Sequence, residues 1–372
     1  IQDNLNNIEM KVGLIVMLLV LVAGLGYTLT RIWQILPFTN TIKGLLFVIP
    51  FMAIASIIIY GSGLIDKLPL NFASFVYELG TSWPMILLYL ALIFGVLDIA
   101  KLAHILPETF LRKSIVGSAS IFIFVTALFV YGNINYKKKV RMPITLTTQK
   151  QLPKAQKIVM ISDVHLGYHN RKEEFKRWVQ LINNEKPDLV LISGDIIDGN
   201  LRPLWEENMA QEFRNIKAPI YACLGNHEYI GGEQNSEKFY KDAGITLLRD
   251  SVATINGINI IGRDDRTNGH RKTLHELTKG IDKDLYTIVL DHQPYHLEQS
   301  EREGIDFQLS GHTHYGQVWP ISWIEDLIYE KAYGPLTKGN TQYFVTSGIG
   351  IWGGKFRIGT QSEYLVAELS NR

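Results

Sequence analysis

The sequence has a single cysteine, little charge in its first third and almost no excess of charge of either sign. Among its 372 residues, Lys and Arg number 37 and Asp and Glu number 36. One cysteine excludes an intrachain disulfide and leaves no set of thiolates for a metal site. The net charge of +1 lacks the strongly basic footprint of a nucleic-acid-binding protein, so we expect no nucleic acid among the partners.

The charges are distributed unevenly along the chain. Between positions 1 and 136, only Lys11, Arg31, Lys43, Lys67, Lys101, Arg112 and Lys113 are basic, and only Asp3, Glu9, Asp66, Glu78, Asp98 and Glu108 are acidic. Charged side chains are about 10% of this part and about 25% of the remainder, an ordinary value for a soluble domain. The chain therefore divides into an apolar first third and a second part of balanced polarity.

The apolar first third contains four segments of the length of a membrane span. They cover residues 12–29, 44–65, 83–106 and 115–131. A helix of this length crosses about 30 Å of hydrocarbon. We predict a four-helix transmembrane region over residues 1–136, and hence a multi-pass membrane protein with the lipid bilayer as a partner. Residues 137–154, interpreted as a basic linker, favour a cytoplasmic position at the cell membrane for the rest of the chain.

The remainder, residues 155–372, consists of short apolar runs that end in polar residues. Such runs, among them KIVMIS and DLVLIS, are typical of strands buried on both faces, and helical patterns lie between several of them. This alternation predicts an α/β domain. Reactive residues at strand ends agree with the usual place of sites in such sheets.

Polar side chains that bind metals follow five of these runs. They are Asp163 and His165, then Asp195 and Asp198, then Asn226 and His227, then His292, and finally His312 and His314. Glycine precedes three of the groups and permits sharp turns. Carboxylate, imidazole and carboxamide donors suit Mn, Fe or Zn. These candidate donors exceed the need of one ion, which indicates two divalent ions that activate a shared water, as hydroxide, to attack phosphorus.

The motifs D-x-H, GDxxD, GNHE, a single His and GHTH, in this order, resemble those of the calcineurin-like metallophosphoesterase superfamily. SGHTHYGQVWP and SGIGIWGGKFRIG are most similar to its membrane-anchored branch. The resemblance implies a fold of two packed mixed sheets flanked by helices. It implies that Asp163, His165 and His314 hold one metal, that Asn226, His292 and His312 hold a second, and that Asp195 bridges them. It also implies that His227 serves the leaving group, with Asp198 orienting it.

The substrate class follows from one departure. Protein phosphatases of the superfamily carry an arginine directly after the second Asp of GDxxD, and this chain has Gly199 there. This favours a phosphodiester or pyrophosphate, and the membrane region favours a lipid-linked or nucleotide-type substrate. The alternatives are a phosphomonoesterase or phosphoprotein phosphatase, and a membrane receptor or scaffold with a non-catalytic, phosphoesterase-like binding module.

Three further features carry hypotheses. Residues 318–333, VWPISWIEDLIYEKAY, are rich in Trp, Tyr and Ile and follow GHTH directly, so they form either an interfacial element or an ordinary lid. Arg357 is a candidate phosphate contact. We expect Glu228 to brace its loop, and His169 to be a surface residue.

Overall fold

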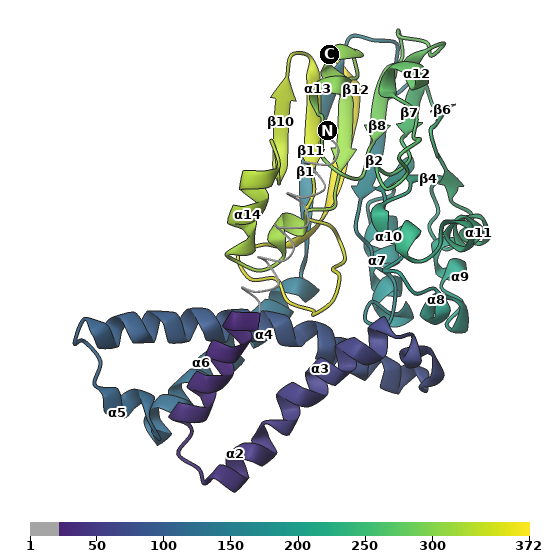
Figure 1. Cartoon of the computed structure of the whole chain (residues 1–372). Coiled ribbons are helices and arrows are strands. Elements are labelled where there is room, and N and C mark those ends of the chain that lie inside the picture. The colour runs from purple at the N-terminus through teal and green to yellow at the C-terminus, as the bar shows by residue number, and fades with distance from the viewer. Residues whose placement is uncertain (1–21) are drawn as a thin grey trace, which may run out of the picture. The chain divides into compact units, whose positions relative to one another are not determined.

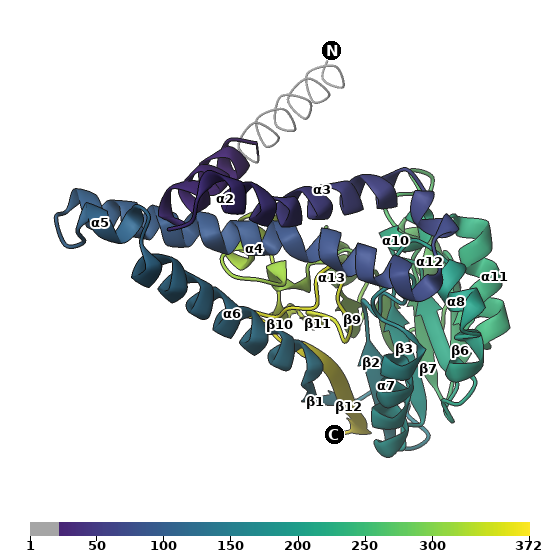
Figure 2. The same cartoon turned by 90° about the horizontal axis from the view of Figure 1, so that it is seen from below.

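The computed structural model describes residues 22–372 of the chain. Contacts divide the chain into two units, each described by itself below. The first holds the described residues up to Lys67 together with Phe75–Tyr131, and the second holds Leu68–Ser74 and Gly132–Arg372. Figure 1 and Figure 2 label most of the helices and strands of both.

The first unit is helical. Residues 22–35 are followed by α2 (Asn40–Leu46), α3 (Val48–Gly61), η1 (Leu64–Lys67), α4 (Leu70–Leu102), α5 (Glu108–Leu111) and α6 (Ile115–Lys137). Among the described residues, three helical stretches are long and apolar enough to cross a membrane, namely Asn40–Gly61, Leu70–Leu102 and Ile115–Lys137. Many of their side chains are both apolar and exposed, as lipid contact requires; Ile99 and Phe122 are examples.

These stretches coincide with three of the four predicted spans. The fourth, residues 12–29, lies mostly outside the described residues. The predicted bounds also differ from those observed, since α4 begins at Leu70 rather than near residue 83 and α6 continues to Lys137. The reason is that a charge-free run marks the apolar centre of a helix, whereas helices often continue through polar residues at their ends.

The second unit contains two six-stranded mixed sheets, which confirms the predicted α/β fold. The first sheet has the order β1-β12-β2-β3-β4-β5 and the second β10-β11-β9-β8-β7-β6. The strands are β1 (Lys139–Thr148), β2 (Gln156–Ile161), β3 (Leu189–Ser193), β4 (Ile220–Cys223), β5 (Thr246–Leu247), β6 (Ser251–Ile255), β7 (Ile258–Gly262), β8 (Tyr286–Leu290), β9 (Phe307–Ser310), β10 (Gly334–Lys338), β11 (Thr341–Val345) and β12 (Ser362–Asn371).

Nine helices of the second unit connect or flank these strands. They are α7 (Lys172–Asn184), α8 (Arg202–Glu206), α9 (Ala210–Phe213), α10 (Asn226–Ile230), α11 (Glu233–Ala243), α12 (Leu274–Thr278), α13 (Glu298–Arg302), η2 (His314–Gly316) and α14 (Ile321–Ile328). Apolar side chains of α7 and α11 pack on one face of the first sheet. The other face packs on the second sheet, where Ile158 and Leu191 lie in one buried cluster with Ile288 and Leu309. Continuous apolar runs are required because both faces of the central strands are buried.

One segment differs from its sequence-based interpretation. Within residues 137–154, which we expected to be a linker, the structure places the strand β1. It pairs in parallel with β12, with Lys139 opposite Ser362 and Thr148 opposite Asn371. Its pairing partner is the last strand of the chain, and most of its side chains are half-buried or exposed because β1 is an edge strand. The composition of this segment alone therefore did not predict strand β1.

Parallel pairing brings the ends of the strands together. In the first sheet β2, β3 and β4 are parallel, and in the second β8, β9 and β11 are parallel. The carboxyl end of each of five strands, β2, β3, β4, β8 and β9, is followed within four residues by a predicted metal-binding side chain. The two sheets therefore deliver these side chains to a common place, at the edge where such folds hold their sites.

Candidate metal centre

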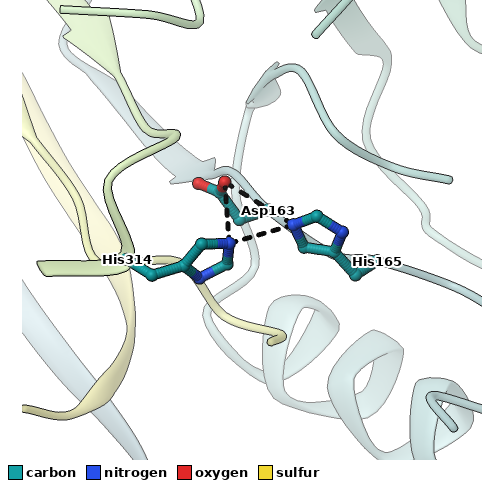
Figure 3. Close-up of side chains that lie close together, drawn as sticks. All are labelled: Asp163, His165 and His314. Carbon is teal, nitrogen blue, oxygen red and sulfur yellow. Dashed lines mark hydrogen bonds and ion pairs between the residues drawn. The ribbon is translucent and has the colours of Figure 1, made fainter. Parts of the chain in front are cut away.

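The first group of the candidate site joins β2 to the loop after β9. Nε2 of His314 lies 3.3 Å from Oδ1 of Asp163 and 3.0 Å from Nε2 of His165. Nε2 of His165 lies 3.8 Å from the same Asp163 oxygen. Figure 3 shows the three side chains pointing toward one another, and all three are buried. Two ring nitrogens and one carboxylate oxygen thus share a small space that a cation could fill.

The second group joins β3, β8 and the loop after β9. Donor atoms of Asp195, His292 and His312 lie within 4.8 Å of one another. Nε2 of His292 is 3.0 Å from Oδ2 of Asp195, and Nδ1 of His312 is 2.8 Å from Oδ1 of Asn226. The structure therefore brings Asn226 to this group as well.

Asp195 lies between the two groups. Its Oδ2 is 3.6 Å from Nε2 of His165 in the first group and 3.0 Å from His292 in the second. Its Oδ1 accepts a hydrogen bond from the main-chain N–H of His227 at 2.9 Å. A Cβ atom on Gly225 would come within 2.1 Å of that oxygen, so glycine is needed for this close approach.

The backbone around the site is strained. Five of the seven candidate donors have a positive φ, which is rare for residues other than glycine; they are Asp163, His165, Asp195, His312 and His314. Each such residue costs about 1–3 kcal/mol, and such strain is concentrated at functional sites. The surrounding structure must hold these turns in place.

Glu228 supplies part of that support, as expected of a brace. Its fully buried carboxylate accepts four main-chain hydrogen bonds, from the N–H groups of Asp195, Ile196, Ile197 and Gly225, at 2.7–3.1 Å. The side chain therefore fixes the loop after β3 to the loop after β4. These two loops carry the shared carboxylate Asp195 and the rim residues Asn226 and His227.

His227 lies at the rim, but its contact with Asp198 differs from the expected one. Nδ1 of His227 donates to the main-chain carbonyl of Asp198 at 2.7 Å, while the Asp198 carboxylate is 3.9 Å away. Oδ1 of Asp198 lies instead 3.1 Å from Nδ1 of His165. The main chain of Asp198 thus orients His227, and its side chain orients a candidate ligand, as carboxylates commonly do for metal-bound histidines.

Gly199 has a positive φ of 136°, a backbone conformation that L side chains rarely adopt. An arginine at this position would therefore have a strained backbone. The backbone conformation after Asp198 therefore favours glycine over the arginine of the protein phosphatases.

The electrostatics of the site balance carboxylates against imidazoles. Burial alone would lower the pKa of His165, but its hydrogen bonds with Asp163 and Asp198 raise the pKa to about 10. Burial lowers the pKa of His312 to about 4, and the charge of His292 acts in the same direction. Protons on some imidazoles offset the buried carboxylates when no cation is bound.

The donors present fit divalent cations. Nε2 of His292 is buried and makes no hydrogen bond within residues 22–372, although it faces Asp195. The Nε2 atoms of His165 and His314 lie 3.0 Å apart, and a cation bound by both would satisfy them better than their mutual contact does. A cation would replace the protons that otherwise balance the carboxylates, because metal ligands bind in their deprotonated forms.

Two residues of the site have roles that the sequence did not reveal. His169 is buried rather than on the surface, with Nε2 donating to the Ile351 carbonyl at 2.6 Å and Nδ1 3.7 Å from the Asp198 carboxylate. Arg357 is fully buried and donates to the carbonyls of His314 and Gly350, so it holds the ligand loop and is not exposed to phosphate. His169 belongs to no recognised motif, and the motif that contains Arg357 does not reveal its role, because both residues act through contacts between distant segments.

The fold and the clustered donors define an α/β protein with a candidate metal centre at the strand ends. The family model of calcineurin-like phosphoesterases matches residues 156–316. An uncharacterized metallophosphoesterase of Aquifex aeolicus is 31% identical over 240 residues, which are 61% of this chain and 90% of the relative. The chain therefore belongs to the calcineurin-like metallophosphoesterases, a class of metal-dependent phosphoester hydrolases.

Other relatives share different parts of the chain. An uncharacterized metallophosphoesterase of Helicobacter pylori is 32% identical over 221 residues, which cover 57% of this chain and 59% of the relative. A transmembrane protein with metallophosphoesterase domain from Danio rerio is 28% identical over 307 residues, 75% of this chain and 69% of that protein. The apolar helices and such relatives identify this chain as a membrane protein.

Proposed function

We propose that the protein hydrolyses a phosphodiester or pyrophosphate bond in a lipid-linked substrate, with two divalent ions of Mn, Fe or Zn. The observation that carries the proposal is the gathering of seven donor side chains in two groups with Asp195 between them. One carboxylate shared by two groups of donors is the arrangement that two adjacent ions need.

In this proposal Asp163, His165 and His314 hold the first ion and Asn226, His292 and His312 the second, with Asp195 between them. Ions bound there would supply a water molecule of lowered pKa and neutralise charge on the phosphoryl oxygens. Two further side chains support the proposed metal ligands. Asp198 and Glu228 fix, respectively, the ring of His165 and the backbone of Asp195.

His227 would assist the leaving group. Its Nδ1 carries a proton, because that atom donates to the Asp198 carbonyl. Nε2 would give a proton, or a hydrogen bond, to the departing oxygen when the ring is in its imidazolium form, with both nitrogens protonated. The side chain is 20% exposed, and this supports access to a substrate at the rim.

The membrane region and Gly199 support the substrate class. The positive φ of Gly199 disfavours a phosphate-binding arginine there, which argues against a phosphoprotein phosphatase. Tethering to a bilayer favours a lipid-linked phosphodiester or pyrophosphate. The basic residues Lys137, Lys138 and Lys139, which end α6 and begin β1, favour a cytoplasmic position at the cell membrane.

The test is hydrolysis by the purified full chain, loaded with Mn or Zn, of bis-p-nitrophenyl phosphate and p-nitrophenyl phosphate. A panel of phospholipids and nucleotide-linked lipids, with products identified by mass spectrometry, would then name the substrate. We expect faster turnover of the diester. A preference for the monoester would favour a phosphomonoesterase, and activity equal to that of Asp195→Asn would favour a receptor or scaffold.

A further inference from the structure

Helix α14 of the second unit presents an apolar face outward. Its residues Trp323, Ile324, Leu327 and Ile328 are exposed by 61%, 54%, 87% and 55%. They stand at positions i, i+1, i+4 and i+5, so they share one side of the helix. Trp319, just before the helix, is 41% exposed, and its ring lies 5.2 Å from that of Trp323. A contiguous apolar patch of this kind marks an interaction surface.

The helix is attached to the candidate metal centre at both ends. It begins seven residues after His314, and Oη of Tyr315 donates to Asp326 on its side at 3.1 Å. At its end, the ring of Tyr329 packs edge-on against that of His312, with 6.3 Å between the ring centroids. Whatever contacts the apolar face of α14 therefore also lies beside the rim of the candidate active site.

The same helix is linked to the segment that leaves the last apolar helix. Residues 355–360 form hydrogen bonds both with the end of α6 and with Trp319, the residue that precedes α14 by two positions. On one side the Arg357 N–H donates to the Gly132 carbonyl at 2.9 Å, and Asn135 donates to the Thr360 carbonyl at 2.7 Å. On the other side the Trp319 N–H donates to the Ile358 carbonyl at 2.7 Å. Gly132 and Asn135 lie in the last two turns of α6, within the second unit.

From these contacts we infer that the outward face of α14 inserts into the interface of the bilayer that the apolar helices cross. The charge-free apolar run of α6 ends at Tyr131, and the same helix continues to Lys137, so the chain would leave the bilayer close to the segment that is tied to Trp319. Paired tryptophans with neighbouring leucine and isoleucine are the side chains that interfacial helices bury among lipid headgroups.

The charges near the patch indicate how it would bind lipid. Lys331, after the helix, is the nearest basic residue in sequence, and Glu325 and Asp326 lie within it. The contact would therefore depend on apolar burial rather than on attraction to anionic lipid. The patch is also continuous with a chain that is already anchored in the same bilayer, so contact requires no separate binding event.

The test uses a fluorescent label on the full chain in proteoliposomes. Cys223 is the single cysteine, is fully buried and has its thiol pKa raised by burial, so an introduced cysteine is labelled selectively. Leu327→Cys carries a polarity-sensitive dye on the patch. Lys283→Cys is the matched control, because it is exposed in the loop before β8, at the opposite end of that strand from His292.

We expect spin-labelled phospholipid to quench the dye at position 327 several-fold more strongly than at position 283, with a blue-shifted emission only at 327. Equal quenching at both positions would overturn the inference. A blue shift that depends on protein concentration and persists in detergent would also overturn it, since it would identify a second copy of the chain as the occupant. The readout requires no catalysis, so it stands whether or not the proposed hydrolysis is found.

Discussion

The inner and outer parts of the candidate metal centre are held by the chain in different ways. Asp163, His165, Asp195, His292 and His314 are buried, and four of these five have positive φ. Asn226, His227 and His312 at the rim are only half-buried. The inner part combines backbone strain with buried charge, which only a balancing ion or proton can offset. The outer part retains access for a substrate. We therefore expect the inner side chains to govern stability and most of the metal binding, and His227, the one rim residue outside the proposed ligand set, to act on turnover alone.

Asp195→Asn gives the largest expected effect, because it removes the one carboxylate common to both groups. We predict a loss of activity of about 1,000-fold or more, accompanied by lower metal content in elemental analysis. Asp242→Asn, at an exposed ion pair with Lys238, is the control and should retain both. Full metal occupancy in Asp195→Asn would show that the inner carboxylate is not needed for binding.

His227→Ala tests the outer part. Because His227 would protonate the leaving group, we predict about 100-fold slower hydrolysis of substrates with poor leaving groups. The loss should be about tenfold or smaller with p-nitrophenyl esters, whose leaving group needs little help. Metal content and thermal stability should not change. Equal losses on both substrates would place His227 in substrate binding instead of proton transfer.

The difference between the two parts also explains what the sequence could reveal. Each inner donor follows an apolar strand, and neighbouring parallel strands end at one edge of a sheet, so Asp163 and Asp195 could be placed near each other from this pattern. The grouping with His292, which follows a strand of the other sheet, came from the resemblance. The α/β class and three of the spans followed from the same apolar runs.

Contacts between distant segments could not be read in this way. The hydrogen bond from the ring of His227 to the main-chain carbonyl of Asp198 joins two loops, and the burial of Arg357 depends on a loop that returns to His314 only after β11. Strand β1 became visible only through its pairing with β12. Such features are set by tertiary packing, which a local pattern does not record.

Removal of metal should affect the inner part selectively. A ligand present at about 100 times its dissociation constant stabilises a folded protein by about 2.7 kcal/mol, so chelation should lower the unfolding temperature by several degrees. We expect this shift in the wild-type chain, measured in detergent with and without a chelator. Asp195→Asn should show a smaller shift. An unchanged unfolding temperature in the wild type would mean that protons balance the buried carboxylates as well as metal does.

Glu228→Gln gives the smallest effect and tests whether the fold or the metal shapes the inner part. The substitution preserves volume, so it creates no cavity, but it replaces one acceptor oxygen by an NH2 group that would face main-chain N–H donors. Because four such donors converge on Glu228, we predict a loss of about 1–3 kcal/mol in stability and a few-fold loss of activity. Glu206→Gln, which breaks an exposed ion pair with Arg202, should change stability by about 0–1 kcal/mol. If metal restores the stability of Glu228→Gln fully, the bound ion holds the loop after β3; if the loss persists with metal, the strained turn depends on Glu228 itself.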